Sequence, residues 1–177
     1  DHHMIFEAFK DFYKEKWVST GVSKDGQTAI MYKAFYPNDM DVAIPYVAPL
    51  NTSKVDPRIF DFLNNVGTKE ERDKVYKYQI AMFENKKKLM PEVKKIAEKN
   101  KWNYTMGIDR GFDLAVLEFP FAMWQYGQIK PLNLPGKKAS ADELLNPLSK
   151  VSALYYFSEQ GIIDFLPHYY QAMTEMG

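Results

Sequence analysis

A serine placed between a short β-prone run and a helical segment is the strongest chemical signal in this sequence. Residues 16–26 read Lys-Trp-Val-Ser-Thr-Gly-Val-Ser-Lys-Asp-Gly, and a helix-compatible segment begins at Lys24. The order strand, Gly-x-Ser, helix is what a nucleophile elbow requires, because the sharp turn presents the serine hydroxyl at the tip of the strand. Gly21 has no Cβ, so the strand and the helix can approach closely there. This pattern predicts Ser23 as a nucleophile.

The start of the helix that follows Ser23 predicts a site where negative charge is stabilised. Backbone N–H groups and the helix dipole both favour an anion at a helix N-terminus, and the backbone N–H of Lys24 is the expected oxyanion donor. The usual motif has a second glycine two positions after the serine. Asp25 stands at that position here, and Gly26 follows it. Taken alone, the motif leaves open an ordinary turn serine.

Further motifs extend along the chain and carry a family resemblance. After residues 16–24 they are Gln27-Thr28, Tyr36-Pro37-Asn38-Asp39, Pro45-Tyr46-Val47-Ala48-Pro49, Val66-Gly67-Thr68, Leu117-Glu118-Phe119, Trp124-Gln125 and Tyr156-Phe157-Ser158-Glu159-Gln160. With them the sequence resembles the bacterial secreted tripeptidyl aminopeptidases, which are relatives of prolyl carboxypeptidase and dipeptidyl peptidase II. The resemblance implies an α/β-hydrolase fragment that carries the nucleophile, and a serine exopeptidase acting on free N-termini. Asp25 departs from the glycine usual in that family.

The same resemblance predicts where the remaining catalytic groups lie. An α/β-hydrolase places its serine, acid and histidine in that chain order, and the family's acid and histidine are expected beyond residue 177. We therefore expect an internal fragment that is inactive alone and whose partners include the missing portions of its own chain. The resemblance also implies a secreted or periplasmic protein, with its signal peptide upstream of Asp1.

Composition narrows the function classes. The 177 residues are enough for a hydrophobic core, with 46% hydrophobic and 15% aromatic residues. Net charge is zero, from 23 basic and 23 acidic side chains, which argues against a nucleic-acid partner. The sequence contains no cysteine, which excludes disulfides and thiolate metal sites. No apolar run reaches the roughly 20 residues of a membrane span.

The pattern of elements divides the chain into two regions. Residues 1–50 alternate helix and strand, which predicts a piece of parallel sheet with packed helices. Residues 51–177 are predicted to form a helical cap that selects substrate. Capping boxes at Thr68–Glu71 and Ser140–Glu143 open two of its helices. The first of these is predicted to run to about Leu89, with a new helix restarting at Pro91 and a last helix over 161–176.

The three histidines are poor candidates for the catalytic base. His2 and His3 precede Ser23 and lie on an opening helix, where a surface or interface position is expected. His168 has the correct chain order, but its aromatic surroundings favour a structural role. Adjacent histidines without a nearby ligand partner are also too few for a metal site. The sequence therefore predicts no metal and no cofactor.

Glu118 is the second candidate site residue. It lies on a predicted helix over about 112–126 that is apolar nearly all round, and such a helix is normally buried. A buried carboxylate is costly unless it is paired. The structural interpretation is a lysine partner or a backbone cap. The functional one is that Glu118 binds the ammonium of a peptide N-terminus, with Trp124 and Gln125 lining the pocket.

Two classes of function remain at this stage. The first is a serine exopeptidase that releases short peptides through an acyl-enzyme on Ser23, with a peptide as substrate. The second is a non-catalytic helical binding or assembly module, or a degenerate relative of the enzymes. Asp25 and the absence of a convincing acid and histidine keep the second class open.

Overall fold

A computed structural model describes residues 1–50, 53, 56–167 and 169–170, and these form two compact units. Among the described residues, the first unit comprises Asp1–Asp56 together with Tyr170, and the second comprises Pro57–Tyr169. The described residues are mostly helical, with one small sheet of two parallel strands. None of the described helices is long and apolar enough to cross a membrane.

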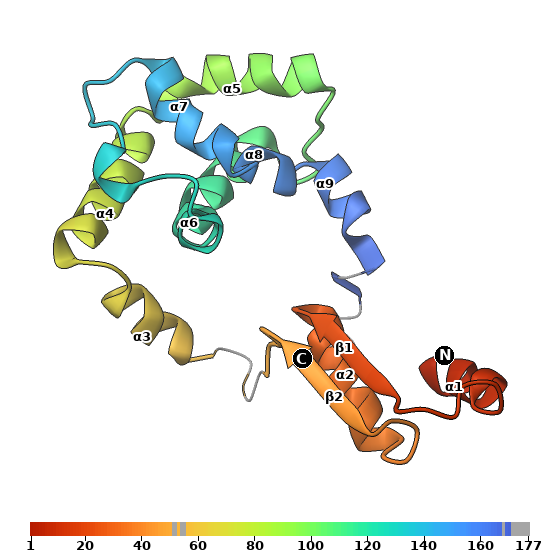
Figure 1. Ribbon diagram of the computed structural model, residues 1–177. Helices are drawn as coiled ribbons and strands as arrows, with labels where there is room; N and C mark the ends of the chain where they lie inside the picture. Colours follow the sequence, from red (N-terminus) through yellow and green to blue (C-terminus); the bar gives the residue numbers. More distant parts are fainter. Residues whose placement is uncertain (51–52, 54–55, 168, 171–177) are drawn as a thin grey trace. The chain divides into compact units, whose positions relative to one another are not determined.

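The first unit is built around a strand–helix–strand crossover. Strand β1 (Val18–Val22) is followed by helix α2 (Lys24–Phe35) and strand β2 (Val42–Tyr46), and the two strands pair in parallel (Figure 1). Val18 pairs with Val42 and Val22 with Tyr46. A parallel pair needs such a crossover, and a helix is its usual form. The predicted alternation of helix and strand over residues 1–50 is therefore present.

Helix α1 (His2–Phe9) contacts the end of this crossover that lies away from Ser23. The Phe6 ring meets Trp17, the residue before β1, edge to face at 5.1 Å. His3 Nδ1 lies 2.7 Å from Asp39 Oδ2, in the turn that leads from α2 to β2. The Tyr32 hydroxyl donates to the same oxygen at 2.9 Å. These contacts hold α1 against the C-terminal part of α2.

The second unit is entirely helical in its described part. Its elements are α3 (Arg58–Asn65), α4 (Lys69–Glu84), α5 (Lys86–Asn100), α6 (Ile108–Tyr126), the short 3₁₀ helix η1 (Pro131–Asn133), α7 (Ala141–Lys150), α8 (Ala153–Tyr156) and α9 (Glu159–Asp164) (Figure 1).

Both predicted capping boxes are confirmed. Thr68 accepts from the Glu71 amide, while the Glu71 side chain accepts from the Thr68 amide, and this pair opens α4. Ser140 and Glu143 do the same for α7. Each box satisfies two N–H groups that a helix start otherwise leaves unpaired.

The predicted boundary at Pro91 is wrong. The break between α4 and α5 falls at Asn85, whose amide donates to Ala81 O at 3.0 Å. The Asn85 side chain donates both to Ala81 O and to Lys137 O, and so fixes the turn. Pro91 lies inside α5, on an exposed part of its surface. The predicted last helix over 161–176 is present in part: α9 ends at Asp164, residues 166, 167, 169 and 170 are again helical, and residues 168 and 171–176 lie outside the described part.

The core of the described chain lies in the second unit. Four apolar residues at heptad-like spacing are all buried there: Val75, Tyr78, Met82 and Leu89. The Tyr78 ring packs on Phe119 at 4.9 Å, and its hydroxyl donates to Leu144 O at 2.7 Å. That bond joins α4 to α7 across the interior. Burial raises the pKa of Tyr78, so this donor keeps its proton.

Two leucine substitutions test this core. Leu144 is fully buried, whereas Leu117 on α6 is 56% exposed. We expect Leu144→Ala to lower the free energy of unfolding by about 2–5 kcal/mol, because it removes apolar contacts and leaves a cavity. Leu117→Ala should change it by no more than about 0.5 kcal/mol. Urea unfolding followed by helical circular dichroism measures both, and equal losses would contradict the assignment of the core.

Candidate active site

Ser23 stands at a strained turn between β1 and α2. Its φ is 56° and its ψ −120°, a region that residues other than glycine rarely adopt. Such a conformation costs on the order of 1–3 kcal/mol and persists only where the surroundings impose it. Here the Ser23 amide donates to Tyr46 O at 2.9 Å, and the Ser23 carbonyl accepts from the Gln27 amide at 3.1 Å. The sheet holds one side of the residue and the helix holds the other.

Two glycines make this turn possible. A Cβ on Gly21 would lie 2.3 Å from both the carbonyl carbon and oxygen of Asp25, so only glycine fits at that point of β1. A Cβ on Gly26 would lie 3.0 Å from Gly21 O and Tyr46 O, the backbones of both strands. Gly26 therefore supplies the close packing of the helix against the sheet.

Asp25, where the sequence departs from the usual motif, leaves the turn intact. Its side chain is 72% exposed and lies 3.5 Å from the Lys24 ammonium. Its carboxylate thus meets solvent and a cation, while its backbone and Cβ lie against Gly21 of β1. The side chain at this position is compatible with the elbow because Gly21, which faces it, has no Cβ.

The hydroxyl of Ser23 is available for chemistry. Ser23 is the N-cap of α2, yet its side chain makes no capping hydrogen bond, and the residue is exposed. A turn serine at this position ordinarily accepts a bond from the second or third amide of its helix. Lys24 is the first residue of α2, where the backbone amides and the helix dipole favour an anion.

Gln27 is a buried polar residue that the sequence reasoning missed as an individual site. It is 8% exposed and follows Ser23 by one helical turn. Its side-chain oxygen is buried without a hydrogen-bond partner among the described residues. Burying an unpaired acceptor costs free energy, so this position is under constraint. The only sequence signal was its place in the Gln27-Thr28 motif.

The N-terminal histidines lie far from Ser23. His3 stacks on Tyr36 at 4.3 Å and bonds Asp39, while His2 meets Tyr32 at 5.3 Å. Burial alone raises the pKa of Asp39, but hydrogen bonds from His3 and Tyr32 outweigh it and hold that pKa below its usual value. Tyr32 is nine residues along the chain from Ser23, about two and a half helical turns or 12–14 Å at 1.5 Å per residue. His168 lies outside the described residues.

Glu118 belongs to the second unit, and the prediction that it is buried is wrong. The core-facing side of α6 is formed by Phe112, Phe119 and Met123, whereas Glu118 and Gln125 are exposed. Glu118 and Phe119 are consecutive, so these faces differ by a rotation of about 100° around α6. The apolar residues on the outer face misled the sequence reasoning. The expected lysine partner or backbone cap is also absent, since Glu118 makes no ion pair or hydrogen bond with other described residues. Desolvation by its neighbours nonetheless raises the pKa of the Glu118 carboxyl.

Trp124 is half-buried and has a packing role. Its ring lies against Gly67, where an added Cβ would be 2.7 Å from Trp124 Cη2. Gly67 has φ +61° and leads into the capping box of α4. Trp124 therefore supports the start of α4, and its side chain packs against the hydrophobic core.

The described residues contain no group of three His, Cys, Asp or Glu side chains that could hold a metal ion. The chemical groups that the geometry does present are a strained serine hydroxyl at a helix start in the first unit and a carboxylate without an ion pair among the described residues in the second.

Comparison with known proteins places this chain among the peptidases. Residues 1–177 match the family described as PS-10 peptidase S37, and the chain belongs to that family. It is 33% identical over 181 residues to a prolyl tri/tetrapeptidyl aminopeptidase of Streptomyces mobaraensis. The match covers 100% of this chain and 38% of that relative. No solved structure matches the chain significantly. The sequence-based family assignment is thus confirmed.

Substitutions at Ser23 distinguish a strained nucleophile from a helix cap. Because the hydroxyl makes no capping bond, Ser23→Ala should change the local opening free energy by no more than about 0.5 kcal/mol, whereas loss of a true cap costs about 1 kcal/mol. Ser23→Gly should raise it by about 1 kcal/mol, because glycine relieves the positive φ. Native-state hydrogen exchange at the Gln27 amide measures both. A loss of protection in the alanine variant would identify Ser23 as a structural cap.

Proposed function

We propose that this chain carries the nucleophile of a serine exopeptidase of α/β-hydrolase type, which releases short peptides from free N-termini. The observation that carries the proposal is the positive φ of Ser23, an exposed serine held between β1 and α2 with no capping bond. Backbone strain of this kind concentrates at functional sites. The name of the Streptomyces mobaraensis relative supports an aminopeptidase acting at tri- or tetrapeptide length.

In the proposed reaction Ser23 Oγ attacks the carbonyl carbon of the scissile peptide bond. A histidine takes the hydroxyl proton, and the oxyanion accepts a hydrogen bond from the Lys24 backbone N–H. The C–N bond then breaks, and the histidine returns the proton to the leaving amine, which carries the C-terminal part of the substrate. The N-terminal peptide remains as an ester on Ser23. Water hydrolyses that ester by the same route in reverse roles.

The histidine and its acid partner are proposed to come from sequence outside residues 1–177. The described histidines of the first unit are engaged with Asp39 and Tyr36 or lie against Tyr32. The chain spans 38% of the length of its curated relative, which leaves ample sequence for both residues. We propose that residues 1–177 alone are inactive. Export from the cytoplasm is proposed from the family resemblance.

Glu118 is proposed to bind the substrate's N-terminal ammonium, with Trp124 and Gln125 beside it. An exopeptidase that counts residues from a free amine needs a negative group at a fixed place. Glu118 is exposed, and the described residues offer it no cation. Its raised pKa means that the carboxylate, the form that binds ammonium, is lost at a higher pH than for an ordinary glutamate.

A fluorophosphonate probe tests the nucleophile. We expect covalent labelling at Ser23 in the protein extended to the full length of its relative, and none in Ser23→Ala. Hydrolysis of a tripeptidyl amide by Ser23→Ala should fall by at least roughly 10⁴-fold, an order-of-magnitude figure from serine triads. Peptide mapping by mass spectrometry locates the label. An extended protein that hydrolyses nothing and takes no label would favour a non-catalytic binding module.

A conservative substitution tests the ammonium site. In the extended protein Glu118→Gln should raise KM for free-amine peptides roughly tenfold, the effect of one lost charge-assisted bond, and leave N-acetylated substrates unchanged. In the unsubstituted protein KM should rise as the pH falls and the Glu118 carboxylate takes up a proton, and this rise should be absent in Glu118→Gln. Glu98→Gln, an exposed glutamate on α5, is the matched control. Equal losses on both substrate types would show that Glu118 does not read the amine.

A further inference from the structure

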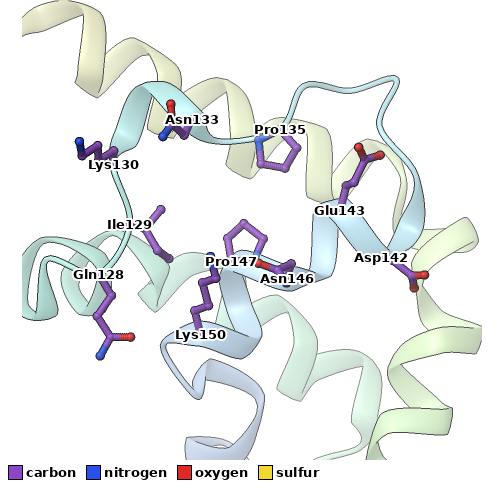
Figure 2. Close-up of a pocket in the computed structure, with 10 residues that line it drawn as sticks. All are labelled: Gln128, Ile129, Lys130, Asn133, Pro135, Asp142, Glu143, Asn146, Pro147 and Lys150. Atoms are coloured by element: carbon purple, nitrogen blue, oxygen red, sulfur yellow. The ribbon is translucent and has the colours of Figure 1, made fainter.

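A pocket of about 720 Å³ lies within the second unit, between α7 and the segment that carries η1 (Figure 2). One wall is a single face of α7, from Asp142 to Lys150, and the other runs from Gln128 to Pro135. Leu134 is 3% exposed and belongs to the core, so the second wall is anchored. None of the lining residues belongs to the candidate active site.

Opposite charges occupy opposite ends of this pocket. Asp142 and Glu143 lie in the first turn of α7, and Lys150 is its last residue. Eight residues separate Asp142 from Lys150, which is about 12 Å along a helix. Lys130 stands on the facing wall, and Figure 2 shows the two lysines toward one side and the two acids toward the other.

Side-chain amides with unused hydrogen-bonding capacity lie between the charges. Gln128, Asn133 and Asn146 line the pocket, and none of their side chains bonds another described residue. The same holds for the ammonium groups of Lys130 and Lys150. Each amide offers two donors and one acceptor, the complement of a peptide backbone group. Ile129 and two prolines supply the apolar part of the lining.

Stabilisation of α7 explains only part of this arrangement. Acids in the first turn and a lysine in the last complement the helix dipole, and Glu143 forms the capping box with Ser140. Those roles involve α7 alone. They leave unexplained why the opposite wall presents Lys130 near the lysine end, and Asn133 across from Asn146.

We propose that this pocket binds a short peptide of three or four residues with both termini free. Its ammonium group lies at Asp142 and Glu143, and its carboxylate at Lys130 and Lys150. An extended peptide of three or four residues spans roughly 10–14 Å, the separation of the charged ends. The amides pair with its backbone, and Ile129 and the two prolines contact its side chains.

The class of ligand is inferred from the residues that line the pocket. The role of this binding in the protein's activity rests on the proposed function. A tri- or tetrapeptidyl exopeptidase releases peptides with a free amine and a free carboxylate. A second site for this class, separate from Ser23, would retain or sense the product.

Binding is tested on the 177-residue chain with Ser23→Ala, so that turnover plays no part. Trialanine should shift the amide resonances of Asn133, Asn146 and Lys150 in an NMR titration, with a Kd on the order of 1 mM. N-acetyl-trialanine amide, which lacks both charges, should bind at least roughly fivefold more weakly. Shifts confined to other residues, or equal affinity for the blocked peptide, would overturn the proposal.

Charge reversal locates the carboxylate end. Lys150→Glu and, independently, Lys130→Glu should each weaken trialanine binding roughly fivefold or more, and Lys99→Glu on α5 should not. Lys130 lies outside α7, so its variant remains informative if Lys150→Glu disturbs that helix. Unchanged affinity in both pocket variants would overturn the proposal. Neither result affects fluorophosphonate labelling at Ser23. The peptide-binding proposal and the proposed function can therefore be contradicted independently of each other.

Discussion

The close approach of the end of β1 to the first turn of α2 is the constraint on which the candidate active site depends. Gly21 touches the backbone of Asp25, and Gly26 touches the backbones of both strands, so the chain reverses direction within one residue. That residue is Ser23, and the compression gives it a positive φ. A hydroxyl held in this way needs no side-chain partner to fix its position. The backbone thus fixes the position of the Ser23 side chain, and it can do so because Gly21 and Gly26 have no Cβ atoms.

Local features of this fold could be predicted from the sequence because their causes are local. The two capping boxes depend on residues three positions apart, and the elbow depends on one glycine and one serine at fixed spacing. The break at Asn85 was missed because its cause is distant. The Asn85 side chain reaches Lys137, 52 residues away, and no window of sequence shows that bond. Pro91 is the stronger local signal for a break, yet α5 continues through it.

The candidate site was predictable in its residue types and less so in its environment. Ser23 was recognisable from its neighbours, but the outward direction of Asp25 follows from packing that only the structure shows. Glu118 was expected inside the cap because α6 is apolar on several faces. The face of α6 that carries Phe119 packs in the core, whereas the face that carries Leu117 and Glu118 is exposed to solvent. Helical periodicity shows which apolar residues share a face of a helix, but it does not show which of several apolar faces another helix covers.

The division of the chain into two units has a consequence for how activity would be lost. The buried residues of the first unit are few, chiefly Gly26, Gln27, Ala29, Asp39 and Met40, whereas the large apolar cluster belongs entirely to the helical unit. Regions with little buried surface open at lower free energy than the rest of a protein. A serine placed there can relax out of its strained geometry while the helices remain folded. Heat or denaturant would then release the strained turn at Ser23 before any change in helical content, and the lifetime of that turn would be set by sub-global opening of the sheet.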